Sequence, residues 1–317
     1  MANPNQPTIS LGIPTYNGAK RISSAIESIY RQGYENLEII ISDNASTDNA
    51  AEVIQEFADK DSRIRFFQQP TNLGLMPNFD FVLQQASSDY FMWVADDDEL
   101  VPDVLSRYVE FLESNPDYSL VSGMINYWKG DVLMRCEKEM STEQTSPVSR
   151  LVNYYGKVKD GALTYGLMRT EAAKAIPVQT ILGPDWHHVA GLAFLGKIKQ
   201  LDFVGYSKQL GGNSVNFVNY ARNFGEHWFW GKAPYMKIAK DAFSEVLYRT
   251  PAYRKMNVVT RLYAATASSF GVLIHFYGKR YPKILAGKLL RAFNITTPNE
   301  RKRMRNQPKK GQVSFSE

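Results

Sequence analysis

The chain has a single cysteine, Cys136, among its 317 residues. One cysteine excludes an internal disulfide and a zinc site built from several cysteines, and it is typical of a reducing compartment. The first residues, Met1 to Thr8, lack a basic segment followed by an apolar block, so we expect no secretory signal. These absences favour a cytoplasmic protein.

Two common nucleotide-binding signatures are also missing. No Gly-x-Gly-x-x-Gly opens the first predicted helix, and no loop ending in Gly-Lys-Ser or Gly-Lys-Thr occurs anywhere in the chain. Ordinary dehydrogenases and phosphate-loop kinases are therefore disfavoured.

Long apolar runs are scarce. The most apolar region, 258–277, contains Arg261 and His275. Its uncharged run from Leu262 to Gly278 has 17 residues, fewer than the roughly 20 needed to span a membrane. We expect a buried or interfacial helix there.

What the sequence does contain is a regular alternation of strand and helix patterns over its first 120 residues. An apolar content of 44% is sufficient for a packed core. Apolar runs predict strands at 8–13, 37–41, 64–67 and 90–94, and helical spacing predicts helices at about 18–32, 50–57 and 79–86. This order predicts an α/β fold with a mostly parallel sheet and helices on both faces.

Polar residues follow each of these strands. They are Pro14, Thr15, Tyr16 and Asn17 after the first, Asp43 and Asn44 after the second, Asn72 and Gly74 near the third, and Asp96, Asp97 and Asp98 after the fourth. Open α/β sheets bind ligands at the carboxyl ends of their strands. A flat base could stack near Tyr16 while Asp43 accepts a hydrogen bond from it, and Gly74 would allow close approach to a ligand.

The three consecutive aspartates are the strongest single signal. Adjacent carboxylates resist joint ionisation unless a positive charge lies among them. A divalent cation shared with the phosphates of a nucleotide would supply that charge. The alternative is a solvated acidic turn.

In the order and spacing of these motifs, the chain resembles family 2 glycosyltransferases, which have the nucleotide-diphospho-sugar transferase fold called GT-A. The resemblance covers about residues 8–215 and rests on four segments. They are Ile13-Pro14-Thr15-Tyr16-Asn17, Ser42-Asp43-Asn44-Ala45-Ser46-Thr47-Asp48, Asn72-Leu73-Gly74 and the segment from Val94 to Pro102 that contains the aspartates.

The resemblance implies a site for a nucleotide-sugar donor, with a UDP-sugar favoured. The donor would contact Pro14, Thr15, Tyr16, Asn17, Asp43, Asn72, Gly74, Asn78 and Asp96, with Thr15, Tyr16 and Asp43 at the base and Asp96 near the ribose. Asp97 and Asp98 would bind Mn²⁺ or Mg²⁺, although the family's D-x-D pattern also fits Asp96 and Asp98. Two segments depart from the family: Pro77 replaces a frequent arginine before Asn78, and Gln209 to Ser214 replaces a Tyr-Arg-x-His segment.

An inverting transfer also needs a base, and the resemblance points to Asp185, which opens a helical pattern at 184–195. A carboxylate there is also favoured as a helix N-cap. The neighbouring Trp186 could form a platform for the acceptor sugar or belong to the core. His187 and His188 point about 100° apart on a helix, so they cannot jointly bind one metal well, and we expect structural or solvent-facing roles.

The basic charge is concentrated near the C-terminal end. Eleven Lys or Arg residues and one acid occur from Lys279 to Lys310, so this segment has a net charge of +10. The whole chain has a net charge of +5, so the remaining residues together carry −5. We expect peripheral attachment to the inner face of the cell membrane through anionic lipid, or else a solvated tail. Nucleic acid is disfavoured because aromatic residues do not interleave these charges.

The predicted organisation is a catalytic domain at 1–225, with a nucleotide-sugar half at about 1–120 and an acceptor half at about 121–225, and a helical extension at 226–317. The predicted activity is inverting transfer of a sugar to a hydroxyl of a glycan or lipid-linked acceptor, in bacterial surface polysaccharide synthesis. Two alternatives remain. One is a nucleotidyltransferase, and the other is a catalytically silent protein that binds sugar nucleotides as a scaffold.

Overall fold

The computed structural model describes residues 6–138, 140–210, 221–222 and 224–278. The chain divides into two compact units, Met1–Val272 and Leu273–Glu317. The predicted division at residue 225 into a catalytic part and a helical extension stays a prediction.

The first part of the chain alternates strands and helices, as predicted. Its elements are β1 (Ile9–Thr15), α1 (Ile22–Tyr30), β2 (Leu37–Asp43), α2 (Ala50–Ala58), β3 (Ile64–Gln68), α3 (Leu75–Gln85), β4 (Tyr90–Trp93), β5 (Glu99–Leu100) and α4 (Val104–Ser114). All seven residues of β1 are buried. Burial of every residue along a strand is typical of a parallel strand that is covered on both faces.

The later elements complete the sheet and add helices to it. They are β6 (Tyr118–Lys129), β7 (Val132–Glu137), α5 (Pro147–Tyr155), η1 (Ala162–Tyr165), β8 (Leu167–Arg169), α6 (Thr170–Lys174), α7 (Pro184–Leu195) and β9 (Lys197–Gln209). The helix predicted at 184–195 is therefore confirmed.

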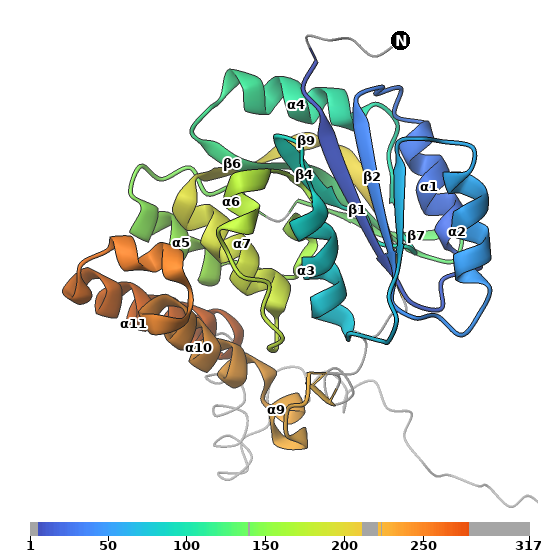
Figure 1. The fold of residues 1–317 in the computed structure, drawn as a ribbon. Helices are drawn as coiled ribbons and strands as arrows, with labels where there is room; N and C mark the ends of the chain where they lie inside the picture. Colours follow the sequence, from blue (N-terminus) through green and yellow to red (C-terminus); the bar gives the residue numbers. More distant parts are fainter. Residues whose placement is uncertain (1–5, 139, 211–220, 223, 279–317) are drawn as a thin grey trace, which may run out of the picture. The chain divides into compact units, whose positions relative to one another are not determined.

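The described strands form one sheet in the order β3-β2-β1-β4-β8-β6-β9-β5, with β7 paired to β6 (Figure 1). Strands β3, β2, β1 and β4 are mutually parallel, and β8 runs antiparallel between β4 and β6. β9 pairs parallel with β6 and antiparallel with the short β5. The predicted mostly parallel α/β sheet is confirmed.

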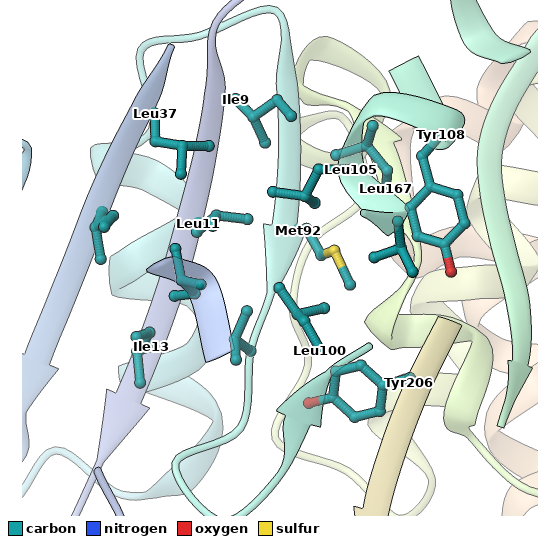
Figure 2. Close-up of a cluster of buried hydrophobic side chains, with 14 of the residues drawn as sticks. Ile9, Leu11, Ile13, Leu37, Met92, Leu100, Leu105, Tyr108, Leu167 and Tyr206 are labelled. Carbon is teal, nitrogen blue, oxygen red and sulfur yellow. The ribbon is translucent and has the colours of Figure 1, made fainter. Parts of the chain in front are cut away.

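Helices cover both faces of this sheet. On one face, Leu11 and Met92 of the sheet pack in one buried cluster with Leu105 of α4 (Figure 2). Ile26 of α1 belongs to the same cluster. On the other face lie α3, α6 and α7 (Figure 1). The sheet is thus held rigidly between two layers, and its strand ends are fixed points for polar side chains.

The remaining described elements are helical. They are α9 (Trp228–Lys232), α10 (Pro234–Ser244), η3 (Glu245–Arg249), η4 (Pro251–Lys255), α11 (Val258–Leu273) and η5 (Ile274–Gly278). The region predicted as a buried or interfacial helix is largely α11. Within the described part of the chain, every helix is too short or too polar to cross a bilayer.

Candidate functional site

Three of the four predicted strand ends meet directly. Thr15 lies beside Asp43 in the parallel register of β1 and β2. The Thr15 hydroxyl donates a 2.5 Å hydrogen bond to Oδ2 of Asp96, in the turn after β4. The polar residues that follow β1, β2 and β4 in the sequence therefore lie at one edge of the sheet.

Hydrogen bonds join the turn after β1 to the turn after β2. Asn17 has a positive φ of 51°, and its side-chain oxygen accepts a 2.8 Å hydrogen bond from the backbone of Thr47. Asp43 is fully buried and accepts from the backbone N–H and the hydroxyl of Ser46. Tyr16, which precedes Asn17 in the chain, has 45% of its surface exposed, so this group offers one open aromatic ring.

A second set of amides links β2 to the segment after β3. Asn44 donates to the side-chain oxygen of Asn72 and to the carbonyl of Gly74, both at 3.1 Å. Gly74 has φ of +92°, a conformation that favours glycine. Asn78 is buried and exchanges hydrogen bonds of 2.6 and 3.0 Å with Ser42, so in this structure it supports the end of β2.

Asp96 is paired within the protein. Besides Thr15, its Oδ2 accepts a 3.0 Å hydrogen bond from the guanidinium of Arg21. Burial raises the pKa of Asp96, while Thr15 and Arg21 oppose that rise. Sequence reasoning did not identify Arg21. Its position just before the first helix, soon after the polar end of the first strand, could have indicated a cation close to the acidic turn.

Asp98 differs from its two neighbours. It is 2% exposed, and its Oδ1 accepts a 2.8 Å hydrogen bond from the backbone N–H of Gln209 in β9. Its Oδ2 is buried and receives no short hydrogen bond in the described structure, although the side chain of Tyr206 favours the ionised form of Asp98. Burial raises the pKa of Asp98 to about 7, although the charge of Lys208 opposes this. Asp97, between Asp96 and Asp98, is exposed.

A carboxylate oxygen that is buried without a partner is a costly arrangement unless a ligand completes it. The described residues contain no group of three His, Cys, Asp or Glu side chains arranged to hold a metal. A cation at this turn would therefore depend on one or two carboxylates together with ligands from outside the protein.

Asp185 lies in the first turn of α7, where a negative charge is favoured by the helix dipole. Its carboxylate lies against Gly161, because a methyl group built on that glycine would fall 1.3 Å from Asp185 Oδ2. Burial raises the pKa of Asp185 to about 6, and the charge of Lys208 is the main opposing influence. A carboxyl group with this pKa is ionised at neutral pH and can still accept a proton.

Lys208 of β9 connects Asp98 with Asp185. Its ammonium lies 4.8 Å from the ring centroid of Tyr165, and its charge acts on both carboxylates. Burial lowers the pKa of Lys208, but Tyr165 and the surrounding carboxylates raise it further, so the side chain stays charged. Lys208 was not identified from the sequence, because a lysine in a strand is common and no motif marks it.

The residues after Asp185 are buried. Trp186 is 7% exposed and stacks on Tyr235 with ring centroids 6.3 Å apart, so the predicted acceptor platform stays a prediction. Nδ1 of His187 lies 2.8 Å from the Tyr155 hydroxyl, and His188 Nε2 donates to the Ala173 carbonyl at 3.0 Å. Both histidines therefore have structural roles.

Two predicted features lie outside the described residues. One is the end of the segment Gln209 to Ser214, from residue 211 onward. The other is the basic segment from Lys279 to Lys310.

Comparisons with known proteins identify the class of this fold. The *Staphylococcus aureus* TarS residues 1–349, solved in complex with UDP-GlcNAc, align with a TM-score of 0.61 and 16% identity over 86% of this chain and 74% of that chain. The mannosyltransferase PcManGT of *Pyrobaculum calidifontis*, solved with GDP-Man and Mn²⁺, aligns with a TM-score of 0.54 and 15% identity over 93% of this chain and 82% of that chain. At these identities the likeness concerns the fold, which is GT-A.

The sequence comparisons give the family. The model of glycosyl transferase family 2 matches residues 10–176, and the chain belongs to this family. A GalNAc(5)-diNAcBac-PP-undecaprenol beta-1,3-glucosyltransferase of *Campylobacter jejuni* is 36% identical over 37% of this chain and 38% of its own length. The putative glycosyltransferase EpsE of *Bacillus subtilis* is 35% identical over 38% of this chain and 44% of its own length. The matches thus span less than half of these relatives.

Proposed function

We propose that this chain is an inverting glycosyltransferase that moves a sugar from a UDP-sugar to a hydroxyl of a glycan or lipid-linked acceptor in bacterial surface polysaccharide synthesis. The observation that carries the proposal is the buried carboxylate of Asp98, whose Oδ2 makes no short hydrogen bond in the described structure. The charge of Lys208 acts both on this carboxylate and on that of Asp185. Two carboxylates around one lysine offer separate places for the leaving diphosphate and the attacking hydroxyl.

The nucleotide would bind at the ends of β1, β2 and β3. Tyr16, which is exposed, would stack on the base, and Asp43 would accept from a ring N–H. Asp96 would bind the ribose through its remaining acceptor capacity, since Thr15 and Arg21 already fix its position. Asn72 and Gly74 would line the same edge, with Asn17 and Asn78 supporting the turns.

The residues present fit a divalent cation. Asp98 supplies a buried carboxylate whose Oδ2 receives no short hydrogen bond, and the next residue towards the N-terminus, Asp97, is exposed. Carboxylate oxygens are the ligands that Mg²⁺ and Mn²⁺ prefer. When bound, the cation would offset the charge that develops on the leaving diphosphate. Asp96 is the less suitable ligand, because its Oδ2 already accepts hydrogen bonds from Thr15 and Arg21.

Asp185 would act as the base. It would take the proton of the acceptor hydroxyl while that oxygen forms a bond to the anomeric carbon. The bond from this carbon to the phosphate oxygen breaks on the opposite side, and its electron pair leaves with the nucleoside diphosphate. A single displacement of this kind inverts the anomeric configuration.

Product analysis on a panel of UDP-, GDP- and dTDP-sugars with Mn²⁺ or Mg²⁺ tests this function, with water as the acceptor where no sugar acceptor is known. We expect release of the nucleoside diphosphate, near-complete loss of release in Asp185→Asn, and retained binding of UDP by that variant. Release of pyrophosphate would instead favour nucleotidyl transfer, and binding without turnover of any donor would favour the scaffold. Wild-type release by Asp185→Asn would reject the base assignment.

We also propose peripheral attachment to an anionic membrane. Val259, Leu262, Tyr263 and Phe270 of α11 are all at least 50% exposed, and Arg254 and Lys255 are exposed just before this helix. Apolar and aromatic side chains with flanking cations suit the lipid interface. Flotation with vesicles containing anionic lipid tests the proposal. We expect the full chain to bind these vesicles and its binding to weaken as the salt concentration rises. Binding should also be weaker for the variant Leu262→Asp and for a chain without residues 279–317. Absence of binding by the full chain would reject the membrane proposal.

A further inference from the structure

The segment that connects α5 to β8 contacts the proposed base directly. The carboxylate of Asp185 lies over the α-carbon of Gly161: a methyl group there would be 1.3 Å from Oδ2 and 2.3 Å from Cγ. Real side-chain carbons do not approach so closely, so an alanine and the present position of Asp185 are incompatible. The backbone of Gly161 has φ of −91°, which any residue adopts. Glycine is therefore required at this position for space and not for conformation.

The residues on either side of Gly161 fix its position. Asp160 Oδ1 accepts a 3.1 Å hydrogen bond from the backbone N–H of Ala162, and its Oδ2 accepts from the hydroxyl of Tyr127 in β6. The same carboxylate lies 3.5 Å from the guanidinium of Arg135 in β7. The turn is thus tied to two strands of the sheet, and Gly161 cannot move away from Asp185 without breaking these contacts.

The other end of the turn faces the cation of the site. Tyr165, the last residue of η1, stacks on Tyr206 of β9 with ring centroids 4.9 Å apart and an interplanar angle of 11°. The Tyr206 hydroxyl accepts a 3.1 Å hydrogen bond from the backbone of Ala95, just before the three aspartates. The ammonium of Lys208 lies 4.8 Å from the ring centroid of Tyr165, the other member of this stack.

The charges of four groups act on the ammonium of Lys208. They are Tyr165, Asp98, Asp160 and Asp185, which come from four different segments of the chain. The groups whose charges act most strongly on Asp185 are Lys208 and, with the opposite sign, Asp160. The charge of Lys208 thus attracts Asp185, while Asp160 on the turn already has Tyr127 and Arg135 as partners.

We propose that Gly161 and Lys208 are positioning residues for sugar transfer: Gly161 leaves the space in which the Asp185 carboxylate lies, and Lys208, which lies over the ring of Tyr165 at the other end of the same turn, attracts that carboxylate. The proposal rests on the proposed function, in which Asp185 is the base. Neither residue needs to touch the substrate. They set the position of the Asp185 carboxylate relative to the bound acceptor hydroxyl. A misplacement of about 1 Å between reacting groups can lower the rate of the chemical step roughly 100-fold.

The first test compares Gly161→Ala with the wild type in release of UDP from the best UDP-sugar of the panel, with water as acceptor. We expect kcat to fall roughly 100-fold while the dissociation constant of UDP stays unchanged. Gly156→Ala is the matched control, because that glycine also has an ordinary φ of −77° and its methyl would meet the carbonyls of Val152 and Asn153 at 3.3 and 3.8 Å, without a closer contact. The control should release UDP at the wild-type rate.

A stability cycle tests the contact independently of activity. Gly161→Ala should lower Tm, and most of that loss should disappear in the Asp185→Ala background, where the clashing carboxylate is gone. An equal loss of Tm in both backgrounds would overturn the steric part of the proposal.

Lys208 is tested by the pH profile, which a merely structural role would not move. In Lys208→Met the acid limb of kcat should shift to higher pH, because removing the cation raises the pKa of Asp185. Lys208→Arg should restore most of the rate and the original limb. The proposal is overturned if Asp185→Asn is inactive while Gly161→Ala or Lys208→Met behaves as the wild type. If Asp185→Asn is itself active, the proposed function fails and this proposal fails with it.

Discussion

The hydroxyl of Thr15 and the carboxylate of Asp96 are joined by a 2.5 Å hydrogen bond although 81 residues separate them in the chain. Thr15 ends β1 and Asp96 follows β4, its parallel neighbour. The bond therefore fixes the acidic turn to the turn that would receive the nucleotide base. Gly18 allows this arrangement, since a methyl group on it would lie 2.2 Å from the Thr15 hydroxyl oxygen.

Replacing Thr15 by valine should weaken this junction. The variant removes a hydrogen bond to a charged group, a loss that costs about 1.5–3 kcal/mol. The free energy of unfolding, measured by urea titration, should fall by this amount, and UDP should bind less tightly. Thr142→Val is the control, because Thr142 is equally buried and its hydroxyl has no hydrogen-bond partner in the described structure. A similar loss in both variants would contradict the role given to Thr15.

The C-terminal end of α7 depends on one buried arginine. Arg150 is 6% exposed and donates hydrogen bonds of 2.7–3.1 Å to the carbonyls of Ala193, Phe194, Gln144 and Thr145. Arg150→Met would leave these carbonyls without donors, and buried unsatisfied groups cost about 1–3 kcal/mol each.

We therefore expect a fall in Tm of many degrees for Arg150→Met in a calorimetric scan. Arg150→Lys should recover only part of the loss, because an ammonium cannot reproduce the planar set of donors. Wild-type Tm in the methionine variant would show that α7, and with it Asp185, is held by other contacts.

The proposed metal ligand should reduce the stability of the protein when no ligand is bound. The folded-state pKa of Asp98, about 7, lies above the ordinary value of 3.8 because of burial. Its stabilising contribution is present at acid pH and is lost as the pH rises toward 7. Asp98→Asn, which can keep the hydrogen bond from Gln209, should thus raise Tm above pH 7 while it weakens donor binding. A lower Tm at pH 8 would contradict this assignment.

The buried histidines should produce the opposite dependence at lower pH. Burial lowers the pKa of His187 to about 3 and that of His188 to about 4, from an ordinary value near 6.5. The stability that comes from their neutral forms is complete above pH 6.5 and is lost as the pH falls toward 4. The unfolding free energy of His188→Gln should fall less steeply across this range than that of the wild type. Parallel pH curves would contradict the neutral, structural assignment.

Much of the fold follows from local patterns that the sequence carries openly. The strands β1 to β4 are rich in apolar residues, and the helices between them repeat apolar residues at helical spacing, so element type and order could be predicted. The polar strand ends could be predicted to meet because parallel strands bring their carboxyl ends to one edge. The register that pairs Thr15 with Asp43 needed the structure.

The partners of the predicted residues were harder to predict because they come from the antiparallel half of the sheet. Lys208 approaches the site only because β9 pairs with β6 and β5, and Gly161 contacts Asp185 only because the turn before β8 folds against α7. Both relationships depend on long-range packing, and neither residue type is unusual in its local segment. The different surroundings of Asp96, Asp97 and Asp98 likewise depend on tertiary contacts that three identical residues cannot reveal.

The most direct test of the account is calorimetric titration of UDP into the wild type and into Asp98→Asn, each with and without Mn²⁺. The account predicts binding by the wild type that strengthens markedly with Mn²⁺, and loss of this Mn²⁺ effect in the variant. Equal UDP affinity in the two proteins under both conditions would contradict the assignment of Asp98 to the donor's diphosphate and its cation.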